Sequence, residues 1–297
     1  MSKKLIVILG PTASGKSDLA VKLAKKFNGE VVSADSRQVY RGMNLGTGKI
    51  TKKEMQGVAH YLLDVARPKR RFTVAQYQKF AFLMISKIFK KEKIPILCGG
   101  TGFYIQSVVD GIVIPRVPPN WKLRKKLEKK DPKQLYKMLK KLDPARAKTI
   151  EKKNPRRLIR ALEIVIKTKK PVPSFKKNPP QYPVLILGIK KSTQELALRI
   201  KSRLKKRLRR GMIAEVKKLR KFGLSWRKLE DFGLEYRWIA RYLQKKISRG
   251  EMIERLQKDI EHFSKRQMTW FRRDQRIFWI KSYRQAEFLV SKFLKSR

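Results

Sequence analysis

The feature that most constrains the fold is a glycine-rich loop near the N-terminus. Five apolar residues, Leu5 to Leu9, run into GPTASGKS at residues 10–17, which fits the pattern G-x-x-x-x-G-K-[ST] without a mismatch. The apolar run is short and lacks a polar face, as in a buried strand of a parallel sheet. Apolar residues then return at helical spacing at positions 19, 20, 23 and 24. A strand, a loop and a helix in this order are the context of a phosphate-binding loop.

The residue types in this loop suit a bound phosphate. Glycines let the backbone N–H groups turn inward, and the start of the helix adds a favourable dipole. In loops of this class, which also bind ATP and other nucleotides, the lysine (here Lys16) reaches the terminal phosphate oxygens and the next hydroxyl (here Ser17) holds Mg²⁺. The alternative is a glycine-rich turn with a chance lysine, which the spacing and context disfavour. The predicted phosphate-binding residues are Gly10, Pro11, Thr12, Ala13, Ser14, Gly15, Lys16 and Ser17, and the predicted cofactor is Mg²⁺.

The charge is the second constraint. The chain of 297 residues carries 76 Lys and Arg against 23 Asp and Glu, a net charge of +53. Such a field attracts polyanions, so RNA or DNA is the expected partner. The alternative is a lysine-rich composition with solvated faces. The charge density peaks at residues 121–180, which carry a net +17 compared with +14 over residues 1–120. A uniform compositional bias does not predict this peak, although it does not exclude it.

Composition and segment lengths exclude several classes of protein. An apolar content of 41% argues against global disorder, and the length suits one large domain or two modest ones. The single cysteine, Cys98, excludes disulfides and a cysteine zinc site, and His60 and His262 show no ligand spacing. The sequence contains no signal peptide and no apolar run of membrane-spanning length. We therefore expect a cytoplasmic protein without a membrane partner.

A second short strand is predicted over residues 30–35 and ends in an acid, Asp35, which lies 19 residues after Lys16. Polar side chains that follow the carboxyl end of a strand lie where open α/β sheets bind ligands. A dinucleotide-binding fingerprint also places an acid about 20 residues on, but the G-x-G-x-x-G pattern that it needs is absent. The alternatives for Asp35 are a helix N-cap or a Mg²⁺ ligand.

A third buried strand is predicted over residues 93–101, after a helix over residues 75–90. Typical ATPases end such a strand in an aspartate that binds Mg²⁺, whereas this one ends in Gly99, Gly100 and Thr101. The difference argues against an ordinary ATP hydrolase. Thr101 places a short hydroxyl beside two glycines that allow a ligand to approach the backbone closely. We interpret Cys98 as a small core residue.

Six segments resemble those of the tRNA dimethylallyltransferases, also called isopentenyl-diphosphate:tRNA transferases. They are GPTASGKS at 10–17, DSRQVYRGMNLGT at 35–47, AHYLLD at 59–64, GGTGFY at 99–104, RRLIRALE at 156–163 and KRQMTWFR at 265–272. The resemblance covers almost the whole chain; the first segment is shared with many NTPases, while the second, fourth and last are specific. The chain departs from the family at Gly48, at Tyr61 and over residues 232–237, which correspond to a third tRNA-contact segment. It has neither the cysteines nor the length for the zinc finger of eukaryotic relatives, so it resembles the bacterial form.

The resemblance implies transfer of a dimethylallyl group from its diphosphate to N6 of adenosine 37, beside the anticodon of tRNA. The loop would then hold a diphosphate leaving group rather than ATP, and Lys16, the loop amides and Mg²⁺ would stabilise the charge that grows on it. Asp35 would accept the N6 proton as general base, and Thr101 would contact the flipped nucleotide or the diphosphate.

The resemblance also implies a set of binding residues. Arg203, eight residues before Gly211, matches the family's diphosphate-binding arginine. The predicted tRNA contacts are Asp35, Ser36, Arg37, Gln38, Thr101, Arg124, Arg156, Arg157, Leu158, Ile159, Arg160, Lys265, Arg266, Gln267 and Arg272. The alternative for Arg157 and Arg160, which share a helical face, is a solvated surface. We interpret Trp270 and Phe271 as core residues rather than as platforms for base stacking.

Proline-rich joints divide the chain into two predicted domains. The fold class is α/β, with a P-loop core and a parallel sheet over residues 1–116 and 190–297, interrupted by a small all-helical insertion over residues 117–189 that contacts tRNA. An apolar strand at residues 184–189 is expected to rejoin the core sheet, and one helix is expected over residues 194–222. A final long helix is predicted to point Ile253, Leu256, Ile260 and Phe263 inward. We expect a monomer.

Two rival functions remain open at this level. One is a small-molecule P-loop kinase, against which the missing aspartate at the end of the third strand counts. The other is a non-enzymatic RNA-binding nucleotide switch or scaffold. The two rivals differ from prenyl transfer in whether ATP is consumed and whether RNA is covalently changed.

Overall fold

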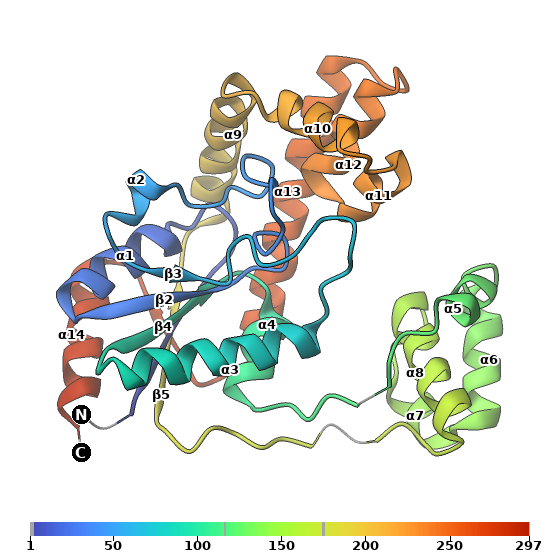
Figure 1. Ribbon diagram of the computed structural model, residues 1–297, viewed down its shortest axis with the longest axis horizontal. Coiled ribbons are helices and arrows are strands. Elements are labelled where there is room, and N and C mark those ends of the chain that lie inside the picture. The colour runs from blue at the N-terminus through green and yellow to red at the C-terminus, as the bar shows by residue number, and fades with distance from the viewer. Residues whose placement is uncertain (1–2, 116, 174–175, 297) are drawn as a thin grey trace. The chain divides into compact units, whose positions relative to one another are not determined.

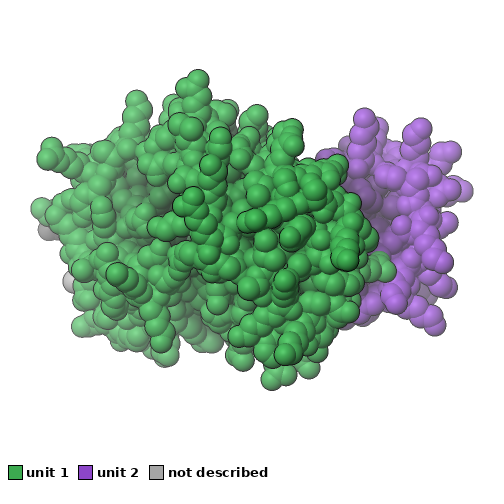
Figure 2. All heavy atoms as spheres, turned by 90° about the horizontal axis from the view of Figure 1, so that it is seen from above, with its two compact units in different colours: residues 1–110, 179–297 green, residues 111–178 purple. Residues whose placement is uncertain are grey.

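The computed structural model describes residues 3–115, 117–173 and 176–296. It divides into two compact units, the core with residues 1–110 and 179–297, and the insertion with residues 111–178 (Figure 2). The insertion therefore starts and ends earlier than the predicted 117–189. Its two ends pair with each other through an antiparallel bridge between Ile112 and Lys177. Residue 116, the predicted end of the first core segment, lies outside the described residues.

The core contains a six-stranded sheet in the order β3-β2-β4-β1-β5-β6, and every neighbouring pair is parallel (Figure 1). The four predicted strands are confirmed, and β5 joins the core sheet beside β1. The sequence analysis missed β3 and β6, which have only two and four residues and so show little periodicity. The strands are β1 Leu5–Leu9, β2 Gly29–Ala34, β3 His60–Tyr61, β4 Ile94–Gly99, β5 Val184–Ile189 and β6 Ile277–Ile280.

Helices cover both faces of this sheet, because side chains of a strand alternate between its faces. Leu5, Val7 and Leu9 pack against α3 and α4, while Ile6 and Ile8 pack against α1 and α14. The covering helices are α1 Lys16–Lys26, α3 Val74–Lys90, α4 Gly102–Val109 and α14 Tyr283–Lys295, and a short helix, α2, spans Lys52–Met55. Among the described residues, no helix combines the length and apolar character needed to cross a bilayer.

A second apolar cluster lies in the C-terminal half of the core, where five helices pack around Val39, Tyr40 and Met43 from the segment after β2. These helices are α9 Thr193–Arg209, α10 Met212–Lys221, α11 Trp226–Phe232, α12 Leu234–Leu243 and α13 Arg249–Phe271. The prediction of one helix over residues 194–222 is wrong, because Gly211 takes a left-handed conformation with φ of 94° between α9 and α10. Ile253 and Phe263 on α13 are only half-buried, whereas Leu256 and Ile260 are buried as predicted.

The insertion is helical, as predicted, over its described residues, and its helices start at recognisable capping residues. Side chains of Asn120, Asp131, Asp143 and Asn154 each accept a hydrogen bond from a backbone N–H in the first turn, and proline opens three of the four helices. Apolar side chains such as Leu135 form a core of its own. The helices are α5 Trp121–Leu127, α6 Pro132–Leu142, α7 Pro144–Thr149 and α8 Pro155–Thr168.

Candidate active site

The glycine-rich loop joins β1 to α1, as its sequence predicts. The chain curls so that the Ser14 N–H donates to Pro11 O at 3.3 Å, and the Lys16 ammonium donates to the same carbonyl at 3.2 Å. Gly15 has φ of 92°, a left-handed conformation that glycine adopts without the steric cost of a Cβ. The loop is thus closed on itself, with Lys16 folded across it.

Opposing effects act on the Lys16 ammonium, and together they lower its pKa. Burial lowers the pKa of Lys16, the negative charge of Asp35 opposes that shift, and the positive charge of Arg203 adds to it. These effects mean that Asp35 and Arg203 act on the Lys16 ammonium through space. A polyanionic ligand beside Lys16 and Arg203 would relieve the repulsion between the two cations and favour their charged forms.

Asp35 directly follows β2 and closes a turn. Its Oδ1 accepts hydrogen bonds from the N–H groups of Arg37 at 2.8 Å and Gln38 at 3.3 Å. The residues after it form a turn and not a helix, so the N-cap alternative is wrong, although the side chain does bind backbone N–H groups. Both bonds converge on Oδ1, which sets the orientation of the carboxylate at the end of the strand.

Thr101 lies at the end of the neighbouring strand, β4, and is tied to the Asp35 turn. Its Oγ1 accepts a hydrogen bond from the Ser36 N–H at 3.0 Å, and its own N–H donates to Ala34 O at 3.1 Å. Gly99 is required for this approach, because a Cβ there would lie 2.1 Å from Ala34 O. The Thr101 hydroxyl keeps its own proton for a hydrogen bond to a ligand.

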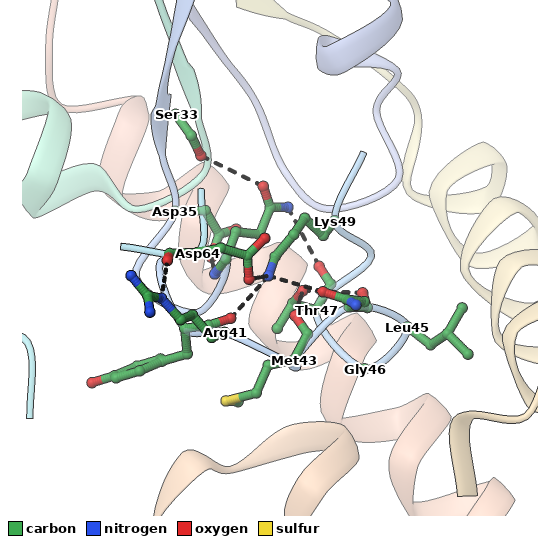
Figure 3. A network of polar contacts seen from close by, with 12 residues as sticks. Ser33, Asp35, Arg41, Met43, Leu45, Gly46, Thr47, Lys49 and Asp64 are labelled. Carbon is green, nitrogen blue, oxygen red and sulfur yellow. Dashed lines mark hydrogen bonds and ion pairs between the residues drawn. The ribbon is translucent and has the colours of Figure 1, made fainter. Parts of the chain in front are cut away.

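The segment that follows Asp35 folds back on itself around a buried lysine (Figure 3). The Lys49 ammonium donates to Tyr40 O at 2.9 Å, to Asn44 Oδ1 at 3.0 Å and to Asp64 Oδ1 at 2.6 Å. Thr47 Oγ1 donates to Met43 O at 2.7 Å. Lys49 therefore fixes the loop over residues 40–49 from inside, next to the predicted acceptor site.

The structure adds functional residues that the sequence analysis missed. The Glu215 carboxylate on α10 accepts the N–H groups of Asn44, Leu45 and Gly46 at 2.7–3.0 Å and the Tyr236 hydroxyl at 2.8 Å. No short motif signals such a contact, because its partners lie about 170 residues apart in sequence. Glu215 therefore holds the loop over residues 44–46 against the C-terminal helices.

Arg207 on α9 supports the same loop from its carbonyl side. Its guanidinium donates to Leu45 O at 3.1 Å and to Gly46 O at 3.2 Å, and it pairs with Glu235 at 2.9 Å. Gly46 leaves room for the Tyr236 ring, which a Cβ at that position would approach to 2.6 Å. Residues 232–237, one of the departures from the family pattern, thus supply Glu235 and Tyr236 to the support of this loop.

Gly48 and Tyr61 are the other two positions at which the chain departs from the family pattern. Gly48 has φ of 59°, and a Cβ there would lie 3.2 Å from a guanidinium nitrogen of Arg203. The absence of a side chain at Gly48 therefore leaves space for the predicted diphosphate-binding arginine. Tyr61 lies on β3 and donates a hydrogen bond to Glu30 at 2.7 Å.

The predicted tRNA contacts of the insertion separate into two groups. Arg156 and Arg157 are exposed on α8, and Arg157 forms an ion pair with Glu151 at 3.3 Å. Leu158 and Ile159 are buried in the insertion core at 0% and 7% exposure, so a side-chain contact with tRNA does not fit this structure. Leu158 and Ile159 lie on the face of α8 that packs into the insertion core, whereas Arg156 and Arg157 lie on its exposed face.

Arg124 and Arg160 meet at a buried acid, Glu163. Arg124 makes two hydrogen bonds to its carboxylate, at 2.8 and 2.6 Å, Arg160 adds one at 2.5 Å, and the Asn120 N–H donates at 2.6 Å. Burial alone would raise the pKa of Glu163, but these hydrogen bonds outweigh it and hold the pKa below its usual value. Both arginines thus help to fold the insertion, whatever they contribute to RNA binding.

The C-terminal end of α13 also separates into two groups. Lys265, Arg266 and Arg272 are exposed, which agrees with a contact surface. Gln267 is only 8% exposed and binds the backbone of the phosphate-binding loop and of Gly100 instead. Trp270 packs against Gly102 and Phe271 is buried, so their interpretation as core residues is confirmed.

Two other candidate groups have simple roles. Cys98 is buried in the cluster beneath α1, and burial raises the pKa of its thiol to about 12, in agreement with a core residue. Among the described residues, no group of three or more His, Cys, Asp or Glu side chains is arranged to hold a metal. Mg²⁺ retains water and phosphate ligands and needs few protein oxygens. The Ser17 hydroxyl at the start of α1 fits an ion that arrives with a phosphorylated ligand.

The fold and the site define a P-loop α/β protein in which a carboxylate and a threonine stand at the strand ends beside the loop. The chain belongs to the IPP transferase family, whose model matches residues 38–274.

Relatives and solved structures agree with this assignment. The chain is 42% identical over 294 residues to the tRNA dimethylallyltransferase of Carboxydothermus hydrogenoformans, covering 96% of the chain and 94% of the relative. It is 40% identical over 284 residues to that of Acetivibrio thermocellus, covering 93% and 91%. The structure of the tRNA isopentenylpyrophosphate transferase from Bacillus halodurans matches with a TM-score of 0.74 at 34% identity, covering 99% and 96%. A eukaryotic dimethylallyltransferase acting on tRNA matches with a TM-score of 0.78 at 30% identity, covering 91% of this chain and 70% of that one.

Proposed function

We propose that this enzyme transfers a dimethylallyl group from dimethylallyl diphosphate to N6 of adenosine 37 in tRNA, forming N6-(dimethylallyl)adenosine and releasing diphosphate. The observation that supports it best is the arrangement of three adjacent strands, β2, β4 and β1, which bring Asp35, Thr101 and the phosphate-binding loop to one edge of the sheet. A donor site at the loop and an acceptor site at Asp35 and Thr101 would then lie side by side, as group transfer requires.

The donor half of the site would hold the diphosphate. Loop amides, Lys16 and Arg203 carry or direct positive charge toward it, and the leaving oxygen gains negative charge as its bond to carbon breaks. Interactions that strengthen with this charge lower the barrier more than they tighten substrate binding. Bound Mg²⁺, held by Ser17 and the diphosphate oxygens, would neutralise part of the same charge.

The acceptor half would receive the adenine. The N6 nitrogen forms a bond to the first carbon of the dimethylallyl group while the bond from that carbon to the diphosphate oxygen breaks. Asp35 takes the proton that N6 loses, and its carboxylate is oriented for this by the Arg37 and Gln38 amides. Thr101 would position the flipped adenine or a diphosphate oxygen through its hydroxyl proton.

The tRNA backbone would be bound by exposed cations. Arg156 and Arg157 of the insertion, and Lys265, Arg266 and Arg272 of the core, are available on the surface. Ser36, Arg37 and Gln38 would approach the anticodon loop because they follow Asp35 directly. We expect the enzyme to act as a monomer in the cytoplasm.

The test is incubation of the protein with dimethylallyl diphosphate labelled in the alkyl group and with bulk tRNA, with Mg²⁺ or with EDTA. We expect label in RNA, at the adenosine next to the anticodon, and loss of the product in EDTA. ATP turnover with a phosphorylated small molecule and unlabelled RNA would show a kinase instead. RNA binding without covalent label or nucleotide turnover would show a scaffold.

A further inference from the structure

We propose that Gln267 is a positioning residue that holds the phosphate-binding loop at a set distance from the Gly100–Thr101 turn, and that it acts on the diphosphate and not on tRNA. The inference rests on the proposed function, since it assigns a role within the same site. It also separates Gln267 from its exposed neighbours Lys265 and Arg266 on α13.

Both ends of the Gln267 amide are used. Its Oε1 accepts a hydrogen bond from the Thr12 N–H at 2.8 Å, and its Nε2 donates to Gly100 O at 2.8 Å. A primary amide is the uncharged side-chain group that offers a donor and an acceptor at this spacing. Gln267 therefore connects the end of β1 to the end of β4 through one rigid planar group.

The helix positions the amide accurately. Ser264, Gln267 and Phe271 are all buried on the same stripe of α13, at 4%, 8% and 3% exposure. The turn after β4 packs closely against this stripe and leaves no room for a side chain, because a Cβ on Gly100 would lie 2.4 Å from Gln267 Nε2 and one on Gly102 would lie 2.3 Å from the Trp270 ring. A polar amide is stable at such a buried position only because both of its hydrogen-bonding partners are present.

The contacts continue to the acceptor side of the site. Gly100 precedes Thr101, whose Oγ1 accepts the Ser36 N–H at 3.0 Å, and Ser36 follows Asp35. The loop that would hold the diphosphate is thus linked through Gln267 to the residues that would hold the adenine. Reacting atoms must come within about 3–3.5 Å, and a misplacement of about 1 Å can lower the rate about 100-fold. Gln267 would therefore determine donor placement without touching RNA.

Two variants test this role, each with a defined loss. Gln267→Glu keeps an acceptor for the Thr12 N–H but, when ionised, offers no donor to Gly100 O. Gln267→Met has a similar length and offers neither. Arg266→Gln is the matched control, since Arg266 is the adjacent, exposed residue of the same predicted contact segment. The measurements are the melting temperature, tRNA affinity without donor, affinity for inorganic diphosphate with Mg²⁺, and kcat and KM for dimethylallyl diphosphate at saturating tRNA.

We expect both Gln267 variants to bind tRNA within about twofold of the wild type while kcat/KM for the donor and diphosphate affinity fall at least about tenfold. Arg266→Gln should lower the tRNA affinity and leave kcat/KM for the donor and the diphosphate affinity close to the wild-type values. Gln267→Glu should also move toward the wild type as the pH falls from 8 to 5.5, because burial at this position raises the pKa of the introduced carboxyl, and its protonated form again has one donor and one acceptor. Gln267→Met should show no such recovery at low pH, because its side chain does not titrate. Dividing by the wild-type value at each pH removes the pH dependence that the variants share with the wild type.

Other outcomes overturn the inference. A loss of tRNA affinity with unchanged donor constants would make Gln267 an RNA contact. Failure of both variants to fold, or equal losses in every measurement, would make it a residue of the core alone. If the wild-type protein prenylates no tRNA, the proposed function fails separately, and the affinities for inorganic diphosphate still decide whether Gln267 acts on the phosphate-binding loop.

Discussion

At the scale of single residues, the most informative side chain is Asp35, because its two roles can be separated. Oδ1 accepts two backbone N–H groups and maintains the turn after β2. Proton removal from N6 needs the negative charge of the carboxylate, whereas the turn needs only an oxygen acceptor. A substitution that keeps the oxygen and removes the charge distinguishes structure from chemistry.

Asp35→Asn should therefore leave the melting temperature and tRNA affinity close to those of the wild type but slow transfer by about 100- to 10,000-fold. The amide oxygen still accepts the Arg37 and Gln38 N–H groups, while the amide cannot take a proton from N6. Single-turnover transfer with saturating donor is the measurement. Wild-type turnover in a variant that binds tRNA normally would remove Asp35 from the role of base.

At the scale of elements, two carboxylates join segments that are distant in sequence. Glu215 attaches α10 to the loop over residues 44–46, and Glu163 attaches α8 to α5 through Arg124. Hydrogen bonds to charged groups contribute more to stability than neutral ones. Each acid is therefore expected to control the local stability of the segment that it joins.

Glu215→Gln should destabilise the core by about 1.5–3 kcal/mol and speed amide hydrogen exchange at residues 44–48, because a carboxamide supplies one acceptor oxygen where three N–H groups and a hydroxyl converge. Urea unfolding and exchange monitored by mass spectrometry measure these effects. The control is Glu251→Gln, which removes an exposed pair with Arg255 and should cost about 0.5 kcal/mol or less. Equal effects of the two variants would argue against a special role for Glu215.

The stability of the insertion should depend on acid pH through Glu163. Its folded-state pKa is held below the ordinary value of 4.5, so the stabilisation is complete above about pH 4.5 and is lost as the pH falls through the lower, folded-state value. Amide protection of residues 155–168 should decrease over that range. Glu163→Gln should lower protection at pH 7 and flatten the acid dependence, while Glu151→Gln on the exposed Arg157 pair should change neither. If Glu163→Gln kept the wild-type acid dependence, Glu163 would not be the group responsible for it.

At the scale of the whole molecule, the net charge of +53 raises the question of which cations bind RNA and which are composition. The structure narrows the choice within the insertion. Arg160 and Arg124 are both engaged by Glu163, whereas Arg156 and Arg157 are exposed. Each phosphate contact releases counterions and adds about 0.7–0.9 to the slope of log affinity against log salt.

Replacing Arg156 and Arg157 together with glutamine should therefore flatten the salt dependence of tRNA binding by about 1.4–1.8 units. Replacing the exposed Lys87 and Lys90 of α3 removes the same charge from the core and should alter the slope far less. Lys16→Ala should leave the slope unchanged and weaken diphosphate binding. The measurement is the tRNA affinity of each of these three variants over a salt series. Equal slopes in the first two variants would mean that the charge of the insertion is compositional.

The sequence by itself determined what local patterns can encode. The loop at residues 10–17, the longer strands and the helical insertion all follow from spacing within continuous segments, where backbone geometry restricts the choices. The resemblance of the motifs then led to the family. The short strands β3 and β6 and the break at Gly211 were missed, because too few residues or one positive φ decide them.

Only the tertiary structure decided which of the motif residues face the ligand. Leu158 and Ile159 belong to the arginine-rich segment but fill the insertion core, and Gln267 belongs to a basic segment but binds Thr12, 255 residues away. Glu215 lies in none of the six motif segments, and Glu163 ends the segment RRLIRALE without a role that the sequence assigned to it. Burial and hydrogen bonding depend on which surfaces meet when the chain folds. The spacing of residues within one segment gives no information about which residues of a distant segment will contact it.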